Sequence, residues 1–369
     1  MTTHATRVAS VRSWPVDIAL REPFGISGGA LSVARNLLVE VVLASGTSGY
    51  GEAAPFPAFN GETREQTEAA LAAVAGTLVG RSASDWRELA VELDASVHAA
   101  ASARAALEMA LVDALARERG VSLAALFGGA GTELVTDITI TTGTAAAARE
   151  AAGRIAREGY ATIKLKVGGA PLGDDVDRVR AVVEAAPGCG LLLDANGGMG
   201  TADAALTLLA EIERVGGRVV LFEQPLGGDD LAGMAVVASR ARCPVAADES
   251  VASADDVARV AAARAASVVN VKLMKSGVAG ALDIVAAARA HGLGLMIGGM
   301  VESSLAMSVS ACLAAGVGGF SFVDLDTPLW MVDEPIVSTM ARVGPRLSVA
   351  SVTAGHGARP RSAVTDRSA

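Results

Sequence analysis

The second half of the chain alternates eight times between strand-like and helix-like segments, and this alternation limits the fold more than any other feature. The strand-like runs are apolar and rich in β-branched residues, and segments with helical periodicity separate them. The strands are expected at residues 137–141, 162–167, 190–194, 219–223, 244–248, 267–273, 294–297 and 319–324. The helices between them include residues 144–158, 174–186, 202–215, 255–264 and 280–291. Such alternation predicts a parallel sheet with helical crossovers.

Eight βα repeats are most simply arranged as a TIM-type barrel, although the pattern alone also allows a doubly wound sheet. No helix follows the eighth strand directly, because Thr327-Pro328-Leu329-Trp330 comes next. We therefore expect an α/β fold whose barrel covers residues 131–328 and whose eighth repeat is truncated. Residues 329–350 are expected to return to the first domain, and residues 351–369 to be disordered because Ala, Gly, Arg, Ser and Thr dominate them.

Residues 1–130 do not alternate between strands and helices, since the expected strands come first and the helices follow. This order predicts a separate α+β domain. Strands are expected at residues 7–19, 37–44 and 49–53, and helices at residues 63–78, 84–93 and 102–117. A glycine-rich segment at residues 22–29 is expected to be a mobile loop, and residues 55–61 a second loop.

Composition excludes several classes of protein. The net charge of −9 and the absence of a basic stripe with aromatics argue against nucleic-acid binding. No apolar run is long enough for a bilayer, and the first residues do not have the pattern of an export signal. Three scattered cysteines without metal-binding spacing favour the reducing cytoplasm. We expect a soluble, cytoplasmic, globular protein with no nucleic-acid or membrane partner, and a homo-oligomer stays open.

Charged residues end five successive strands of the predicted barrel. They are Lys166, Asp194, Glu223, Asp248 and Lys272, separated by 28, 29, 25 and 24 residues. The carboxyl ends of barrel strands meet at one mouth, where active sites lie. A charge at the end of an apolar strand is costly without a partner, so this recurrence predicts a functional site.

Asp194, Glu223 and Asp248 form an oxygen-only set without nearby histidine or cysteine. Such a set suits Mg²⁺, with Mn²⁺ as an alternative and Zn²⁺ disfavoured. Each acid could instead cap the helix that follows its strand, which is the simpler explanation for one aspartate but a weaker one for three. Because no histidine ends a predicted strand, a Ser/His/Asp triad is not expected.

Lys164 and Lys166 lie two residues apart, so they share one face of their strand. Repulsion between them, and a cation near Lys272, should lower the lysine pKa values towards those of a general base. Structural ion pairs with the carboxylates are the alternative. Lysines on opposite sides of a metal suit proton abstraction next to a carboxylate, with Lys166 on one face of the α-carbon, Lys272 on the other, and Lys164 tuning Lys166.

Asp324 and Asp326 repeat this spacing with acids at the end of the eighth strand. Two neighbouring carboxylates need a cation, which a substrate ammonium group would provide. A surface turn before Pro328 is the alternative.

Taken together, these motifs resemble the enolase superfamily, and Lys164-Leu165-Lys166 is similar to the Lys-x-Lys motif of its muconate-lactonizing branch. Residues 103–113 resemble the helix that leads into the barrel, and Leu126-Phe127-Gly128-Gly129 the end of that connection. The resemblance implies an α+β capping domain over a (β/α)7β barrel. It also implies that Asp194, Glu223 and Asp248 bind Mg²⁺ and that Lys272 is the second acid/base. Residues 23–29 and 55–61 would be the mobile capping loops.

Asp324-Leu325-Asp326 looks like the Asp-x-Asp signature of dipeptide epimerases, in which the acids hold the substrate ammonium. The chain is therefore expected to be an isomerase that inverts the α-carbon of a dipeptide's C-terminal residue by 1,1-proton transfer through an enolate. Enzymes of this group that act on L-Ala-D/L-Glu can carry an arginine in the first capping loop, but residues 25–29 contain no cation. A less acidic C-terminal residue is expected instead.

Other functions stay open at this stage. A cycloisomerase, an o-succinylbenzoate synthase or an N-acylamino-acid racemase of the same branch would not need Asp324 and Asp326 as an ammonium site. An inactive barrel that only binds a small molecule should have lost some of the five rim charges, and none is missing.

Overall fold

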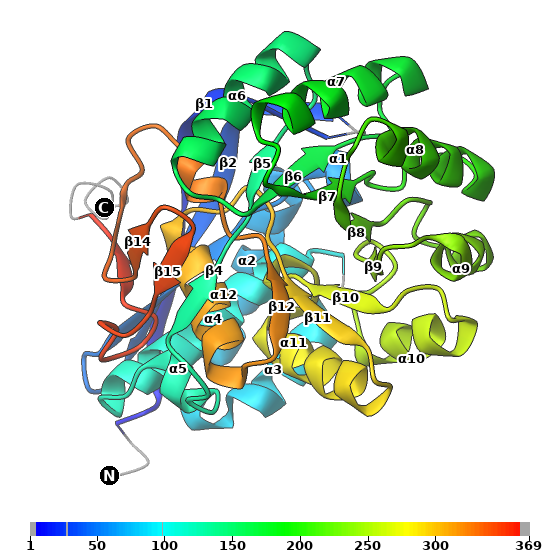
Figure 1. Ribbon diagram of the computed structural model, residues 1–369. Helices are drawn as coiled ribbons and strands as arrows, with labels where there is room; N and C mark the ends of the chain where they lie inside the picture. The colour runs from blue at the N-terminus through cyan, green and yellow to red at the C-terminus, as the bar shows by residue number, and fades with distance from the viewer. Residues whose placement is uncertain (1–4, 27–28, 98, 362–369) are drawn as a thin grey trace.

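A computed structural model describes residues 5–26, 29–97 and 99–361 of the chain (Figure 1). Its central element is an eight-stranded parallel sheet. The strands are β5 (Ile138–Ile140), β6 (Thr162–Lys166), β7 (Gly190–Asp194), β8 (Val219–Glu223), β9 (Val245–Ala247), β10 (Val268–Val271), β11 (Gly294–Ile297) and β12 (Phe320–Val323). Neighbours in the sheet are neighbours in the chain. This order confirms the parallel sheet and excludes the doubly wound alternative, in which the order reverses part-way.

The sheet curls around an apolar interior. Leu192, Leu221, Ala246 and Met296 come from four strands and are all fully buried there. At the two ends of the sheet, the Asp137 backbone N–H donates to the Val323 carbonyl at 2.9 Å. No ladder pairs β5 with β12 in the described part of the chain, so a curled sheet is what the structure establishes.

Helices cover the convex face of the sheet, as Figure 1 shows for α6 to α10. The helices of this part are α6 (Ala145–Arg157), α7 (Leu172–Ala185), α8 (Ala202–Arg214), α9 (Leu231–Arg240), α10 (Ala254–Ala263), α11 (Leu273–Ala290) and α12 (Ser304–Val317). Helix α11 begins seven residues before the expected 280–291. A kink at Gly277, where φ is 67°, separates its first turn from the remainder of the helix. Because the helix is interrupted there, the sequence pattern did not indicate that it begins at Leu273.

The N-terminal domain, called the cap below, contains an antiparallel sheet with helices packed on it. Its elements are β1 (Val8–Ile26), β2 (Gly29–Leu43), β3 (Ser48–Ala53), α1 (Pro57–Asn60), α2 (Arg64–Leu78), η1 (Ala83–Asp85), α3 (Trp86–Ser96), α4 (Ala101–Glu118) and α5 (Leu123–Leu126). All three expected strands and all three expected helices are present, with shifted ends.

Both expected loops of the cap are partly wrong. Strand pairing resumes between Phe24 and Leu31 after an irregularity, so residues 22–26 and Gly29 belong to a long hairpin. Phe24 and Ile26 are buried, which stabilises this extension in a way that the glycines alone do not reveal. The second loop contains the short helix α1. Ser27 and Gly28 lie outside the described residues.

The C-terminal segment is ordered as far as it is described, so the expected disorder is wrong for residues 351–361. After η2 (Thr327–Trp330) come β13 (Ile336–Ser338), β14 (Ala341–Val343), β15 (Arg346–Ser348) and β16 (Ala358–Pro360). Strand β16 pairs with β13, and β15 pairs with both β14 and β4 (Glu133–Val135). His356 is buried against Asp113 of α4, and this long-range contact holds a segment of disorder-prone composition. Residues 362–369 lie outside the described part.

None of the described helices has the length and apolar character needed to cross a membrane.

Candidate active site

The five predicted rim charges come together at the carboxyl ends of the strands. Lys166, Asp194 and Glu223 are the last residues of β6, β7 and β8, and they are direct neighbours in the sheet register. Asp248 and Lys272 directly follow β9 and β10. All five are buried, with exposed fractions of 5% or less. Because burial of an unpaired charge is costly, each requires a partner of opposite sign.

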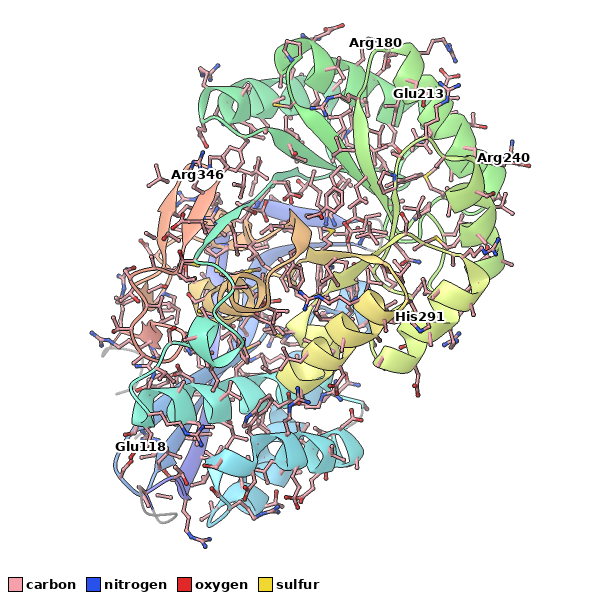
Figure 2. All side chains as sticks on the ribbon, turned by 60° about the horizontal axis from the view of Figure 1, so that its bottom comes forward. Glu118, Arg180, Glu213, Arg240, His291 and Arg346 are labelled. Carbon is pink, nitrogen blue, oxygen red and sulfur yellow. The ribbon has the colours of Figure 1, made fainter. Side chains whose placement is uncertain are left out.

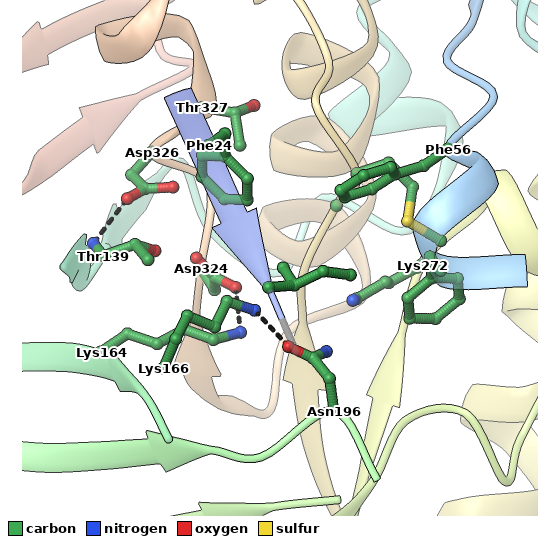
Figure 3. A pocket seen from close by; sticks show the side chains of 14 residues that line it. Phe24, Phe56, Thr139, Lys164, Lys166, Asn196, Lys272, Asp324, Asp326 and Thr327 are labelled. Atoms are coloured by element: carbon green, nitrogen blue, oxygen red, sulfur yellow. Dashed lines mark hydrogen bonds and ion pairs between the residues drawn. The ribbon is translucent and has the colours of Figure 1, made fainter. Parts of the chain in front are cut away.

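Protein carboxylates provide the partners of the Lys164–Lys166 pair. Lys164 Nζ lies 2.9 Å from Asp194 Oδ2, 2.8 Å from Glu223 Oε2 and 2.7 Å from Asp324 Oδ2. Lys166 Nζ donates to Asp194 Oδ2 at 2.7 Å and to Asn196 Oδ1 at 3.0 Å (Figure 3). One aspartate oxygen therefore receives both ammonium groups.

Lys272 occupies the other side of the site. Its Nζ donates to Asp248 Oδ2 at 2.7 Å and lies 4.8 Å from the centre of the Phe59 ring. Lys275 Nζ donates to Asp248 Oδ1 at 2.7 Å, to the Asp248 carbonyl at 2.6 Å and to the Asn270 carbonyl at 3.1 Å. Asp248 is thus held by two lysines, as Asp194 is.

The carboxylates reverse the expected direction of the lysine pKa shifts. Burial acts to lower the pKa of Lys164, but the charges of Asp194, Asp324 and Glu223 outweigh it and raise that pKa well above its ordinary value. The pKa of Lys272 is raised in the same way, against burial, by Asp248 and Glu223. The expected lowering is therefore wrong for these two lysines in this arrangement of side chains.

The acids divide into two kinds. Burial would raise the pKa of Asp194, but Lys164 and Lys166 hold it below its ordinary value. Burial and repulsion by Asp194 raise the pKa of Glu223 to about 7. Glu223 is the weakly compensated member: Asn270 donates to its Oε1 at 2.6 Å, whereas Oε2 accepts no hydrogen bond of good geometry.

The three strand-end acids fit a divalent cation by their chemistry. Asp194, Glu223 and Asp248 offer buried carboxylate oxygens only, the ligands that Mg²⁺ prefers, and Glu223 Oε2 is ion-paired with Lys164 but accepts no hydrogen bond. Among the described residues no three acid, histidine or cysteine side chains are gathered as a preformed metal cluster, since lysine ammonium groups lie between the acids. The ligand assignment therefore stays a prediction.

Asp324 and Asp326 are both buried, which argues against a surface turn. Their surroundings differ. Asp324 is paired with Lys164, whereas Asp326 Oδ2 accepts from the Thr139 backbone N–H at 2.6 Å and lies 3.5 Å from Trp330 Nε1. Asp326 Oδ1 has no hydrogen-bond partner. Only Asp326 is thus left with an acceptor for a further cation, although the sequence predicted two equivalent acids.

An apolar wall faces these charges across a pocket. Phe24 and Ile26 come from β1, Phe56 precedes α1, Phe59 lies on it, and Met300 follows β11. Figure 3 shows Lys166 and Lys272 pointing towards each other from opposite sides of this pocket. Sequence reasoning identified the charges but missed the wall and Asn196. Asn196 could have been found from its place two residues after a strand-end acid.

The sequence also matches known families over most of its length. Residues 8–128 match "Mandelate racemase / muconate lactonizing enzyme, N-terminal domain", and residues 146–364 match "Enolase C-terminal domain-like". The chain belongs to the mandelate racemase/muconate lactonizing enzyme family, which has an enolase-like C-terminal domain. The resemblance drawn from the motifs is therefore confirmed, and so is a fold made of a cap and a parallel αβ sheet.

Relatives in this family include enzymes named for dipeptides. The aromatic dipeptide epimerase of Herpetosiphon aurantiacus is 48% identical over 95% of this chain and 98% of its own length. A solved mandelate racemase/muconate lactonizing protein from the same organism superposes with a TM-score of 0.93 at 47% identity, covering 97% of this chain and 99% of that one. The dipeptide epimerase of Enterococcus faecalis, solved with Mg and L-Leu-L-Tyr, has a TM-score of 0.91 at 28% identity, covering 95% and 99%.

We predict that Lys164→Met destabilises the metal-free protein by about 3 kcal/mol at about pH 8, because it leaves buried acids without their cation. The unfolded chain ionises Glu223 near its ordinary pKa of 4.5, whereas the folded variant must keep it protonated to a higher pH. The deficit should therefore shrink as the pH falls to about 5. Urea unfolding of both proteins in the presence of a chelator measures this difference in the free energy of unfolding at each pH.

Arg180→Met is the matched control, because Arg180 pairs with Asp177 at the surface. It should change stability by no more than about 0.5 kcal/mol at either pH. A Lys164→Met deficit that is equal at both pH values would contradict the charge balance described above.

Proposed function

We propose that this protein is a Mg²⁺-dependent dipeptide epimerase that inverts the α-carbon of the C-terminal residue. The observation that carries the proposal is the pair of buried lysines, Lys166 and Lys272, aimed into one pocket from opposite sides, with an unpartnered Asp326 oxygen beside them. Two acid/base groups on opposite faces suit removal of a proton from one face and its return to the other.

Each lysine has a defined task. The lysine that removes the α-proton must be neutral at that moment, and the lysine opposite must be an ammonium that donates. After one turnover the two states are exchanged, so the same pair serves the reverse reaction. Lys164 adds fixed positive charge behind Lys166 through its contacts with Asp194 and Glu223.

Asp194, Glu223 and Asp248 would hold Mg²⁺. When bound, this ion supplies positive charge that stabilises the negative charge developing on the substrate carboxylate as the α-proton leaves. A cation there would also occupy the acid oxygens that now raise the lysine pKa values, and so favour a neutral lysine.

Asp326 would receive the ammonium group of the dipeptide on Oδ1. Its burial, with the pKa raised first by desolvation and then by Asp324, shows that a full negative charge is costly there without a cation. The Thr139 N–H holds Oδ2 and so orients the carboxylate. An N-acylated amino acid carries no such ammonium, and this distinguishes the epimerase from the racemase alternative.

The apolar wall supports a hydrophobic or aromatic side chain on the substrate. Phe24, Phe56 and Phe59 face the pocket, and the described part of the first capping segment, Gly25, Ile26 and Gly29, has no cation for a glutamate side chain. The name of the Herpetosiphon aurantiacus relative and the L-Leu-L-Tyr bound to the Enterococcus faecalis enzyme agree with this choice.

Finer features belong to the same proposal. The hydrogen bond from Asp137 to Val323 supports a sheet closed as a (β/α)7β barrel. The oxygen ligands would also accept Mn²⁺. The free cysteines Cys189, Cys243 and Cys312 support a cytoplasmic location.

Lys166→Ala and Lys272→Ala should each lower epimerisation of a hydrophobic dipeptide by about 100-fold or more, because each removes one of two proton-transfer groups. The two epimers are followed separately by proton NMR in deuterated water. A variant that retains the wild-type rate of epimerisation would eliminate the two-base mechanism.

Asp326→Asn should lower turnover of the dipeptide by about 100-fold, since a buried ammonium would lose its anionic partner. N-acetylated amino acids, which have no ammonium, serve as the control substrate and should be affected much less. Equal losses on both substrates would remove the ammonium assignment.

Among Ala-X dipeptides, those with X as Phe, Tyr or Leu should exchange their α-proton at least about tenfold faster than Ala-Glu. The panel is compared by kcat/KM under identical Mg²⁺. Preference for Ala-Glu would refute the hydrophobic assignment and leave the reaction type standing.

A further inference from the structure

Lys272 and Lys275 sit on an unusual stretch of backbone. Lys272 lies between β10 and α11, Lys275 lies in the first turn of α11, and α11 is kinked at Gly277, with φ 67° and ψ −174°. Lys272 is the residue that caps the first turn of α11, and Ser276 Oγ donates to its carbonyl at 3.3 Å. The direction of the Lys272 side chain therefore depends on what holds this first turn.

Helix α4 of the cap supplies that support through Arg104 and Glu108. Arg104 Nη2 donates to the Lys275 carbonyl at 3.0 Å, on one side of the kink. Glu108 Oε2 accepts the Ala279 backbone N–H at 2.8 Å, on the other side. Glu108 is 1% exposed, and Arg104 Nε lies 3.7 Å from its Oε1. The two side chains thus hold both ends of the kink from a separate domain.

The backbone conformation at the kink, with φ 67° and ψ −174°, favours glycine, and Glu108 fills the adjacent space. A Cβ added to Gly277 would lie 2.4 Å from Glu108 Oε1, well inside contact distance. The carboxylate therefore occupies the space that a side chain would need. It also meets backbone N–H groups where the longer part of α11 begins, and these partly offset the burial that raises the pKa of Glu108 to about 7.

We propose that Glu108, with Arg104, is a positioning residue for Lys272, so that the cap aligns one of the two proton-transfer groups. The inference rests on the proposed function. Lys166 lies on β6 and contacts Asp194 and Asn196, so it does not depend on this support. The Asp248 backbone is also anchored outside this segment, since its N–H donates to Gln224 Oε1 at 2.8 Å. Loss of Glu108 should therefore impair one face of the reaction only.

The test measures α-proton exchange of L-Ala-L-Phe and L-Ala-D-Phe separately in deuterated water with saturating Mg²⁺. Lys272→Ala first identifies which epimer depends on Lys272. Glu108→Ala should then slow exchange of that same epimer by about 100-fold, as expected for a misplaced catalytic group, and slow the other by less than about threefold. Glu108→Gln, which keeps an acceptor for the Ala279 N–H, should restore most of the loss.

Glu118→Ala is the matched control on the same helix. Glu118, labelled in Figure 2, ends α4 and accepts from Ser45 and Thr47 instead. It should leave the ratio of the two exchange rates unchanged. If Glu108→Ala does not fold, Glu108→Asp, which withdraws the carboxylate, is measured for the same ratio.

An equal loss for both epimers, or no loss, would overturn the positioning role, because a general effect on folding or on the metal site cannot be one-sided. If the wild-type protein exchanges the α-proton of both epimers and Lys272→Ala loses exchange of only one, the proposed function is supported whatever the result for Glu108→Ala. If the wild-type protein exchanges neither epimer, the proposed function itself fails.

Discussion

The balance of buried charges at the strand ends is the interaction on which the remainder of the site depends. Asp194 is fully buried and accepts two lysines on one oxygen, while Asp248 accepts two others. Removing charges from water is compensated only when opposite charges lie within a few ångströms. Parallel strands in chain order satisfy this condition, because every strand presents its carboxyl end to the same rim. The order of the strands in the sheet therefore brings the lysines and carboxylates close enough to compensate one another's charge.

The cap completes this rim and changes its character. The β1–β2 hairpin brings Phe24 against Trp330, with ring centres 5.2 Å apart and planes at 84°, while the Val332 N–H donates to the Ala19 carbonyl. Aromatic side chains thereby face the lysines and acids across the pocket, and a less polar surrounding strengthens every charge interaction within it. The curled sheet contributes the charged groups, and the cap contributes the pocket wall and the support of α11.

The sheet was predictable because buried parallel strands are short apolar runs between helices, and three of them begin and end where the sequence places them: β7, β8 and β11. The errors share one cause. The extension of β1 beyond residue 19, the first turn of α11 and the ordered residues 351–361 are stabilised by partners distant in the chain. These partners include Trp330, Arg104 and Asp113, respectively. The pKa directions were missed for the same reason, because they depend on which acid lies nearest to each lysine.

The sequence by itself determined which residues reach the rim, since the spacing of the strands places Lys166, Asp194, Glu223, Asp248 and Lys272 at their carboxyl ends. That is sufficient for an oxygen-ligand site flanked by lysines. Only the tertiary structure decided how the charges are paired: Asp324 with Lys164, and Asp326 with an oxygen left over. The reason is physical, because position along a strand selects an edge of the sheet, whereas the energy between two charges depends on separations that packing alone establishes.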